Sequence, residues 1–220
     1  MVHVRIDGGG GGIPAGVGSP LKSKRLQHDV IVIGASTGGV HALCDLFAQL
    51  GSLDAIVGVV LHRRPNSGRL STLLHYFGGD RVREPLDGET LTPGRVYLAP
   101  AGCHMRFEAP HIALARSEDG NGRAPAIDPL FTSAARSLGR RVVGVLLSGT
   151  GSDGIAGLRA IKDAGGVTIV QDPSEALAAD TPSRALRFAS VDATLGLASL
   201  PRALAALASG DGAQGAWKQS

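Results

Sequence analysis

The sequence predicts an α/β fold with a doubly wound, mainly parallel sheet, an antiparallel hairpin and helices on both faces. Short apolar segments alternate with segments of helical pattern, as in DVIVIG, VHALCDLFAQL and AIVGVVLH, and this alternation is typical of βαβ units. The hydrophobic fraction is 43% and the aromatic fraction only 4%, so Val, Leu, Ile and Ala must build the core, as in buried parallel sheets. At 220 residues the chain has room for one such core.

The expected elements follow in order along the chain. The first three are a strand, a helix and a strand, at residues 29–34, 40–50 and 55–62. Residues 81–100 contain short β-rich pieces around Asp87-Gly88 and Pro93-Gly94, and residues 104–116 continue in the same style; both segments are predicted to form antiparallel hairpins on one side of the sheet. The doubly wound pattern then resumes with helix, strand, helix, strand and a terminal helix, at residues 128–139, 141–149, 155–165, 167–172 and 199–210.

The domain is expected at residues 29–209, between two flexible segments. Residues 1–28 include DGGGGGIPAGVGSP, a composition that buries too little apolar surface to offset the entropy of ordering it, and we expect a flexible leader. Residues 210–220 are expected to be a flexible tail. Basic side chains near the end of the leader fit a solvated linker better than a contact with an acidic partner: Lys22, Lys24, Arg25 and His28.

Composition argues against several classes of function. The net charge of +3 and the pI near 9.2 come from basic residues scattered without interleaved aromatics, so no nucleic-acid partner is expected. No apolar run approaches the roughly 20 residues of a membrane span, and the N-terminus lacks the apolar core of a signal peptide; we expect no membrane insertion and a cytoplasmic location. Cys44 and Cys103 lack metal-ligand spacing and are expected to be buried or idle thiols in a reducing compartment.

Three loops carry the residues that could do chemistry. GASTGG, HRRPNSG and SGTGSDG each follow a predicted parallel strand, and the carboxyl ends of such strands are where ligands collect in open α/β sheets. The loops offer Ser36, His62 and Asp153. This set matches the needs of acyl transfer, in which histidine accepts the serine proton and aspartate fixes the imidazole tautomer.

The turn around Ser36 adds detail to this hypothesis. Residues 34–38 fit G-x-S-x-G, in which small residues let a tight strand-to-helix turn expose the serine. The N–H groups of Thr37 and its neighbours would then point toward a developing oxyanion. The chain order Ser, His, Asp argues against an ordinary α/β-hydrolase, because the last histidine is His111, with most of the sheet still to come.

Other interpretations remain open. Dinucleotide binding is favoured by the glycine turn and by Arg63 and Arg64, which could hold a 2′-phosphate, but Ser36 stands where G-x-G-x-x-G needs its second glycine. Each residue also has a purely structural interpretation. Ser36 could be a turn residue, His62 could bind its own backbone, and Asp153 could cap the helix that begins at Ile155.

The chain resembles the chemotaxis protein-glutamate methylesterase family over about residues 29–207. The resemblance is carried by VIVIGASTGG, the His62 segment with Pro65, LTPGRVYLAP, the pair His104-Met105, IDPLF, VVGVLLSGTGSDGIAGLRAIKDAGG and VTIVQD. It implies that the family's catalytic triad corresponds to Ser36, His62 and Asp153, and that residues 29–209 form the methylesterase-like domain. It further implies hydrolysis of a glutamyl methyl ester through an acyl-serine, with no metal or organic cofactor.

The departures from the family pattern lie in the loops around these three residues. The family's Gly-Met-Gly reads Gly149-Thr150-Gly151, and its Gly-Met-Pro loop reads Asp180-Thr181-Pro182. Backbone at Thr150 and Gly151 could still serve the oxyanion, together with Thr37. The family's receiver domain is not expected within 28 glycine-rich residues, so we expect a stand-alone domain without phosphorylation control in cis.

The resulting functional hypothesis is a serine ester hydrolase that demethylates, and could deamidate, a chemoreceptor or another signalling protein. His104 and Arg63 are candidate substrate contacts, although plain loop packing explains His104 as well. The alternatives are a catalytically inactive interaction module and, less favoured, an NADP-binding protein. Nothing in the sequence points to an obligate assembly, and a monomer is expected.

Overall fold

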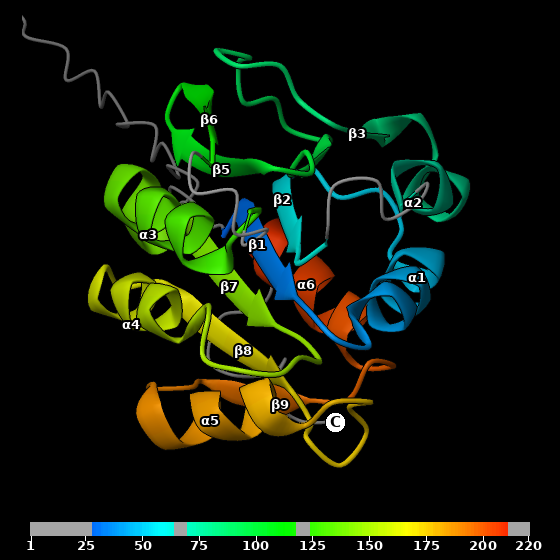
Figure 1. Cartoon of the computed structure of the whole chain (residues 1–220), viewed down its shortest axis with the longest axis vertical. Coiled ribbons are helices and arrows are strands. Elements are labelled where there is room, and N and C mark those ends of the chain that lie inside the picture. The colour runs from blue at the N-terminus through cyan, green and yellow to red at the C-terminus, as the bar shows by residue number, and fades with distance from the viewer. Residues whose placement is uncertain (1–27, 64–69, 118–123, 211–220) are drawn as a thin grey trace, which may run out of the picture.

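The computed structural model describes residues 28–63, 70–117 and 124–210 (Figure 1). The strands are β1 (Val30–Ala35), β2 (Ile56–Leu61), β3 (Val82–Arg83), β4 (Val96–Leu98), β5 (Cys103–Glu108), β6 (His111–Arg116), β7 (Val142–Leu146), β8 (Val167–Gln171) and β9 (Ala193–Leu195). The helices are α1 (Gly39–Gln49), α2 (Leu70–Gly78), α3 (Ile127–Leu138), α4 (Ile155–Asp163), α5 (Asp180–Phe188) and α6 (Leu200–Ser209), with 3-10 turns at Gly79–Arg81 and Gly139–Arg141.

Seven strands form one parallel sheet in the order β3-β4-β2-β1-β7-β8-β9. The central strand is β1, in which Val30 lies opposite Ile56 of β2 on one side and opposite Val142 of β7 on the other. The chain builds outward from β1 on the β2 side first and then returns to the β7 side. The strand order therefore reverses at β1, where the carboxyl ends of neighbouring strands leave a crevice.

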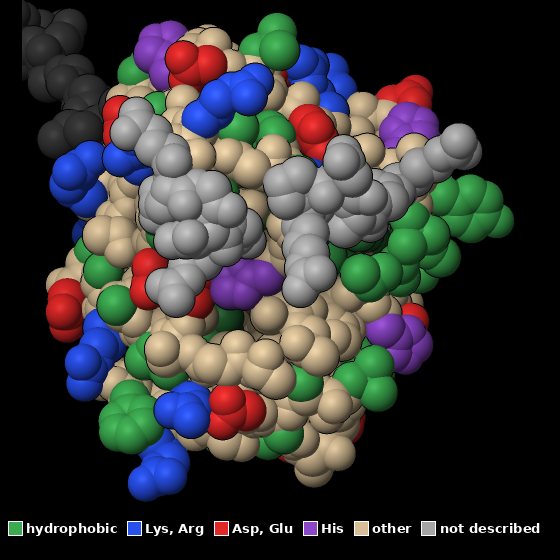
Figure 2. Space-filling view, viewed as in Figure 1, with side chains coloured by type: hydrophobic (Ala, Val, Ile, Leu, Met, Phe, Trp, Pro, Cys, Tyr) green, Lys and Arg blue, Asp and Glu red, His purple; other side chains and the backbone are tan. Residues whose placement is uncertain are grey.

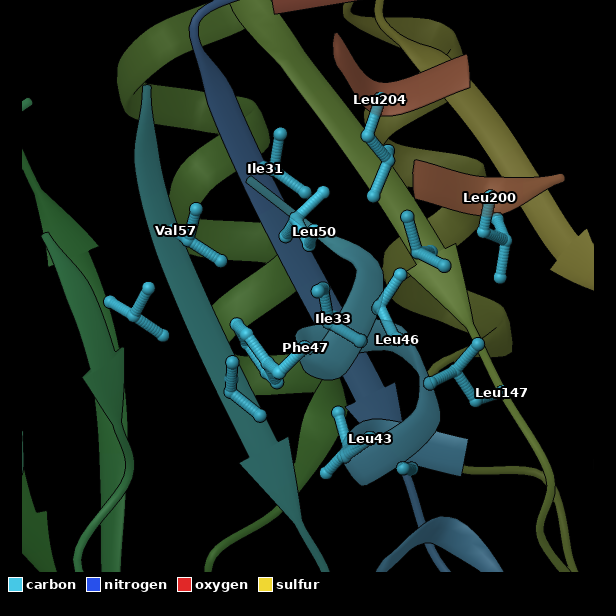
Figure 3. Packing of buried hydrophobic residues seen from close by; sticks show 14 of the residues in the cluster. Ile31, Ile33, Leu43, Leu46, Phe47, Leu50, Val57, Leu147, Leu200 and Leu204 are labelled. Atoms are coloured by element: carbon cyan, nitrogen blue, oxygen red, sulfur yellow. The ribbon is translucent and has the colours of Figure 1, made fainter. Parts of the chain in front are cut away.

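Alternate residues of the strands face two separate cores. Ile31 and Ile33 of β1 point into a core covered by α1, α2 and α6, where they meet Leu46 and Phe47 of α1 and Leu204 of α6 (Figure 3). The other core contains apolar side chains from β1, β2, β7, α3, α4 and the β5–β6 hairpin. Both faces of the sheet are thus buried, which explains why β1, β2 and β7 carry only apolar residues. The predicted fold class is confirmed.

The prediction for residues 81–100 was wrong in its pairing. Turns do occur at the predicted glycines, since Gly88 and Gly94 have φ of 77° and 79°. However, β3 and β4 pair with each other in parallel and join the main sheet beside β2. Turn residues indicate where the chain bends, but they do not indicate which strands pair. The segment between β3 and β4 is long enough for the chain to return to the end of the sheet where β3 begins, and parallel pairing requires such a return.

The second predicted hairpin is confirmed. Strands β5 and β6 pair antiparallel in a sheet of their own, with Met105 opposite Leu114 and Phe107 opposite Ile112. Met105 and Phe107 are fully buried in the core that also contains α3. The hairpin therefore covers α3 from outside the main sheet.

The predicted flexible leader and tail lie almost wholly outside the described residues, as do Lys22, Lys24 and Arg25. The domain limits at residues 29 and 209 stay predictions. Among the described helices, none is long and apolar enough to cross a membrane.

Candidate functional site

The three candidate residues come from three loops at the carboxyl edge of the sheet. Ser36 follows β1, His62 follows β2, and Asp153 lies between β7 and α4. Nδ1 of His62 lies 3.1 Å from Oγ of Ser36, and Nε2 of the same ring lies 2.6 Å from Oδ2 of Asp153. The three side chains thus form one hydrogen-bonded series, although Ser36 and Asp153 are 117 positions apart in the chain.

The hydrogen bonds assign the imidazole tautomer. A carboxylate accepts hydrogen bonds and does not donate them, so Nε2 of His62 carries the proton that it donates to Asp153. Nδ1 is then the lone-pair nitrogen, and the Ser36 hydroxyl donates to it. The two ring nitrogens take the opposite roles from those in the serine-protease triad, where Nε2 faces the serine. The arrangement still connects a hydroxyl, a base and an anion in the same order.

Asp153 is held by backbone as well as by His62. Its Oδ2 also accepts from the N–H of Ile127 at 2.7 Å, and its Oδ1 accepts from the N–H of Asp128 at 2.9 Å. The pKa of the Asp153 carboxyl lies below its ordinary value. Burial is the largest single influence and acts to raise this pKa, but the hydrogen bonds from His62, Ile127 and Asp128 together outweigh burial. The carboxylate is therefore kept ionised beside the imidazole.

The structural interpretation of Asp153 as the cap of the following helix is wrong. Helix α4 begins after Gly154 and has no side-chain cap from that residue. The Asp153 carboxylate caps α3 instead, because it receives the first two N–H groups of that helix. His62 likewise does not bind its own backbone through its ring, since both ring nitrogens contact side chains.

The Ser36 turn is fixed by contacts with Ser148, which lies in the loop that follows β7. The N–H of Ser36 donates to the carbonyl of Ser148 at 3.0 Å, and the hydroxyl of Ser148 donates to the carbonyl of Thr37 at 2.8 Å. Gly38 then adopts φ of 78° and leads into α1. A Cβ on Gly38 would lie 2.6 Å from Oγ of Ser148 and 2.7 Å from Cβ of Leu177, so only glycine fits this turn.

The candidate oxyanion residues differ in what their N–H groups bind. Gly151 donates its N–H to Oδ2 of Asp180 at 2.9 Å, so that group is already used. The N–H groups of Thr37 and Thr150 have no acceptor within the part of the chain that the structure describes. The hydroxyls of Thr37 and Thr150 lie 3.2 Å apart, which links the loop after β1 to the loop after β7.

Helix α5 holds the loop of residues 149–152 in place. The N–H of Thr181 donates to the carbonyl of Gly149 at 3.0 Å, and the Thr181 hydroxyl donates to the carbonyl of Gly151 at 3.2 Å. Asp180 binds the N–H of Gly151 from the same helix end. The pKa of the Asp180 carboxyl is lowered, first by the Gly151 N–H and then by Arg184. Hydrogen bonds thus fix the loop that contains Thr150 against the helix end that contains Thr181.

A cavity of about 650 Å³ opens beside His62 and Asp153. Its walls come from the loops after β2 and β7 and from the start of α3: His62, Arg63, Pro125, Ala126, Thr150, Gly151, Ser152 and Asp153. This volume is enough for an extended side chain and its neighbours. On the face shown in Figure 2, acidic and basic side chains are interspersed and form no broad patch of one sign.

Arg63 and His104 lie at different distances from this cavity. Arg63 lines it, but its side chain is only 8% exposed, and its guanidinium is bound to Glu84 and to the carbonyl of Ala99. His104 lies on β5, and its Nδ1 accepts from the N–H of Ala126 at 3.3 Å, which places the ring behind a residue of the cavity wall. The contact supports packing of the loop before α3, and a substrate contact for either residue stays a prediction.

Sequence reasoning missed the residues that support the site from behind. Ser148 is 1% exposed and joins the turn after β1 to the segment before α5, because its hydroxyl also accepts from the N–H of Ala178. Gln171 accepts from the N–H of Ser148 at 2.8 Å. Asp128 lies within the segment IDPLF, but only its contacts with Gly154 and Gly157 show what it binds. Among the described residues, no cluster of three His, Cys, Asp or Glu could hold a metal ion.

Comparison with known proteins agrees with this architecture. Residues 31–204 match the CheB methylesterase family. A protein-glutamate methylesterase/protein-glutamine glutaminase of Anaeromyxobacter dehalogenans is 38% identical over 188 residues, which cover 84% of this chain and 54% of that protein. The corresponding protein of Moorella thermoacetica is 38% identical over 209 residues, covering 91% of this chain and 49% of that protein.

A solved structure extends the likeness to the fold. The catalytic domain of the Thermotoga maritima CheB methylesterase matches with a TM-score of 0.74 and 29% identity, covering 81% of this chain and 98% of that domain. The chain spans about half the length of the curated relatives that it matches. The family match nevertheless covers most of the described residues, and the chain belongs to the CheB methylesterase family.

Proposed function

We propose that this chain is a serine carboxyl-ester hydrolase that removes methyl groups from glutamyl methyl esters of a protein. The observation that carries the proposal is the hydrogen-bonded series from Ser36 through His62 to Asp153. The names of the relatives, which include protein-glutamate methylesterase, support the same substrate class. The open cavity beside His62 supports access by a side chain that projects from a folded partner.

The geometry supports the following sequence of steps. Oγ of Ser36 attacks the ester carbonyl carbon while Nδ1 of His62 takes the hydroxyl proton, and the carbonyl oxygen becomes an oxyanion. The imidazolium is stabilised by the ionised Asp153. When the intermediate collapses, His62 returns the proton to the leaving methoxide, and methanol departs. Water then attacks the acyl-serine with His62 as base, which releases the glutamate carboxylate and regenerates Ser36.

The oxyanion is proposed to bind the N–H groups of Thr37 and Thr150. Both groups lie in the loops that flank Ser36, and neither has an acceptor among the described residues. Helix α1 begins at Gly39, so the positive end of its dipole lies next to the same turn. Because the N–H of Gly151 is bound to Asp180, Gly151 is proposed to shape the loop and not to donate to the oxyanion.

Deamidation is proposed as a second reaction of the same site. The relatives' names include protein-glutamine glutaminase. The same acyl-serine forms from a glutamine side chain if ammonia leaves in place of methanol, and His62 supplies the proton in both cases. The partner is proposed to be a methylated or glutamine-bearing chemoreceptor, or another signalling protein, met in the cytoplasm by a monomeric domain.

The experiment that tests the proposal is labelling with a fluorophosphonate probe, followed by mass spectrometry of the labelled peptide. The probe reacts with activated serines, and we expect modification of Ser36 alone. Ser36→Ala should abolish labelling, whereas Ser71→Ala on α2 is a control that should leave it unchanged. A folded protein that takes no label would reject the hydrolase and favour a catalytically inactive interaction module.

A substrate assay completes the test. The labelled protein should lose the ability to release methanol from a methyl-esterified protein in proportion to the label incorporated. If instead NADPH binds with micromolar affinity and this binding is lost in Arg63→Ala, the glycine turn serves a dinucleotide and the proposal is wrong.

A further inference from the structure

The amino ends of helices α3 and α4 are joined by reciprocal hydrogen bonds, in which a carboxylate next to one helix accepts from backbone N–H groups of the other. Asp153 stands just before α4 and binds the first N–H groups of α3, as described above. Asp128 stands in the first turn of α3 and binds α4: its Oδ1 accepts from the N–H of Gly154 at 3.0 Å and from the N–H of Gly157 at 2.7 Å. Neither helix has a side-chain cap from its own N-cap residue. Asp153 and Asp128 therefore provide hydrogen-bond acceptors for the amino ends of α3 and α4, respectively.

The close approach of the two helices depends on Gly157. A Cβ on this residue would lie 2.3 Å from Cβ of Phe131 and 3.1 Å from Oδ1 of Asp128. The distance to Phe131 is too short for any side chain, so glycine lets the α4 backbone reach the Asp128 carboxyl. These reciprocal hydrogen bonds thus depend on the close packing of α3 against α4. They hold in place the turn of residues 152–154, which contains Asp153.

We propose that Asp128 is a positioning residue of the site, which holds Asp153 against His62 through the two hydrogen bonds that its Oδ1 accepts from the turn and first residues of α4. The proposal rests on the function proposed above. Asp128 is not part of the cavity wall formed by the residues around His62, so it acts on the chemistry through Asp153. Its contribution is the place of an acceptor atom, not its negative charge.

The electrostatic surroundings of Asp128 support this distinction. Its pKa is raised, first because burial disfavours the ionised carboxyl and then because the Asp153 carboxylate lies beside it, while the N–H groups of Gly157 and Gly154 oppose the shift. The environment therefore does not favour a second negative charge at this place. A neutral side chain with an oxygen at the same position should serve as well as the carboxylate.

The test compares three substitutions by their hydrolysis of p-nitrophenyl acetate. Asp128→Asn keeps an acceptor oxygen in place and should leave kcat within a few-fold of the native value. Asp128→Glu keeps the charge but displaces the acceptor by one methylene, and Asp128→Ala removes the acceptor. Both variants should have a lower kcat. For Asp128→Ala we expect a loss of about a hundredfold, because a small misplacement of a catalytic group has effects of this size. KM should stay unchanged in all three, since Asp128 does not touch the substrate.

The control is Asp29→Asn. Asp29 pairs with Arg141 at the amino end of β1, on the opposite edge of the sheet, so this substitution removes a carboxylate without touching the site. If Asp128→Ala does not fold, the Asn and Glu variants still decide the question. Native kcat in Asp128→Glu, or a kcat in Asp128→Asn as low as in Asp128→Glu, would overturn the proposal.

Amide hydrogen exchange separates this proposal from the proposed activity. The N–H of Ile127 bonds to Asp153 and not to Asp128, so it reports whether Asp153 stays in place. We expect faster exchange of this amide in Asp128→Ala and Asp128→Glu and native exchange in Asp128→Asn. That result would stand even if the native protein hydrolysed no ester. Unchanged exchange at Ile127 in Asp128→Ala would refute the positioning role.

Discussion

The amino ends of α1 and of α3 and α4 differ in what their N–H groups bind. At α3, the Asp153 carboxylate receives the first two N–H groups, and at α4 the Asp128 carboxylate receives the N–H groups of Gly154 and Gly157. At α1, the N-cap residue is Gly38, no side chain caps the helix, and the first turn has no acidic residue. Helix α1, which begins beside Ser36, thus has no anionic side chain at its positive end.

A helix end can be used for stability at some places in this fold and not at others. A carboxylate at a helix N-terminus stabilises the helix by about 0.3–1 kcal/mol, so a bare end is a cost. At α1, however, a developing oxyanion would compete with such a side chain for the same N–H groups. The bare end is therefore expected beside the nucleophile, and the capped ends are expected where Asp153 must be held.

The largest effect is expected for Asp153→Ala, which removes the acceptor at α3 and the partner of His62 together. We expect kcat for ester hydrolysis to fall by about 10⁴-fold, as for the aspartate of other triads. Stability should fall by about 1–2 kcal/mol, because α3 loses its cap. Turnover and urea denaturation measure the two losses. A variant that is destabilised but turns over ester at the native rate would show that Asp153 is a helix cap only.

A smaller effect on activity is expected when a carboxylate is introduced at the amino end of α1, as is found at the amino ends of α3 and α4. Val40 is 42% exposed in the first turn of α1. Val40→Glu should stabilise the protein slightly through the helix dipole and lower kcat/KM by about tenfold, because its charge opposes the oxyanion. Val40→Gln is the uncharged control of the same shape. Equal kcat/KM in the two variants would show that α1 does not act on the developing charge.

The pH dependence of stability should separate Asp153 from its neighbour. Because the folded-state pKa of Asp153 is lowered, its charge contributes stability that is present above the unfolded value of about 3.9 and is lost as pH falls through the folded pKa. The difference in unfolding free energy between native protein and Asp153→Asn should therefore be largest near neutral pH and shrink below about pH 4. A difference that stays constant down to pH 2 would contradict this account.

The opposite sign is expected for Asp128. Its raised pKa means that the folded state favours the protonated carboxyl, so ionisation costs stability as pH rises through the folded pKa. The unfolding free energy of Asp128→Asn relative to native protein should consequently increase from acidic to neutral pH. Guanidinium denaturation at a series of pH values measures both dependences, and parallel curves for the two Asn variants would show that the carboxyls do not differ.

The smallest effect is expected at the loop of residues 149–152, where an exposed carboxylate binds a backbone N–H. Asp180→Ala should lower kcat/KM only a few-fold, because Thr181 still binds Gly149 and Gly151. Arg184→Ala is the control, since it removes the ion pair with Asp180 and keeps the acceptor for Gly151. A loss in Arg184→Ala equal to that in Asp180→Ala would assign the effect to the ion pair.

Local pattern was sufficient for much of the fold and for the choice of site residues. Apolar runs predicted β1, β2, β7 and β8, and the loops that follow β1, β2 and β7 supplied Ser36, His62 and Asp153. Their side chains do converge, because parallel strands of one sheet end at one edge. Their catalytic roles stay predictions. Helix α5 was not predicted, since its sequence DTPSRALRF is mainly polar and buries only Thr181, Pro182 and Ala185.

Residue patterns alone were therefore enough for the central strands of the sheet, their burial on both faces and the loops that meet at the carboxyl edge, since periodicity encodes burial within a few residues. The pairs of atoms that come into contact depend on tertiary packing. It determined the parallel pairing of β3 with β4, the ring nitrogen of His62 that faces Ser36, and the helix that Asp153 caps. These contacts join residues far apart in the chain, and packing of complete helices against the sheet sets their distances to a fraction of an ångström.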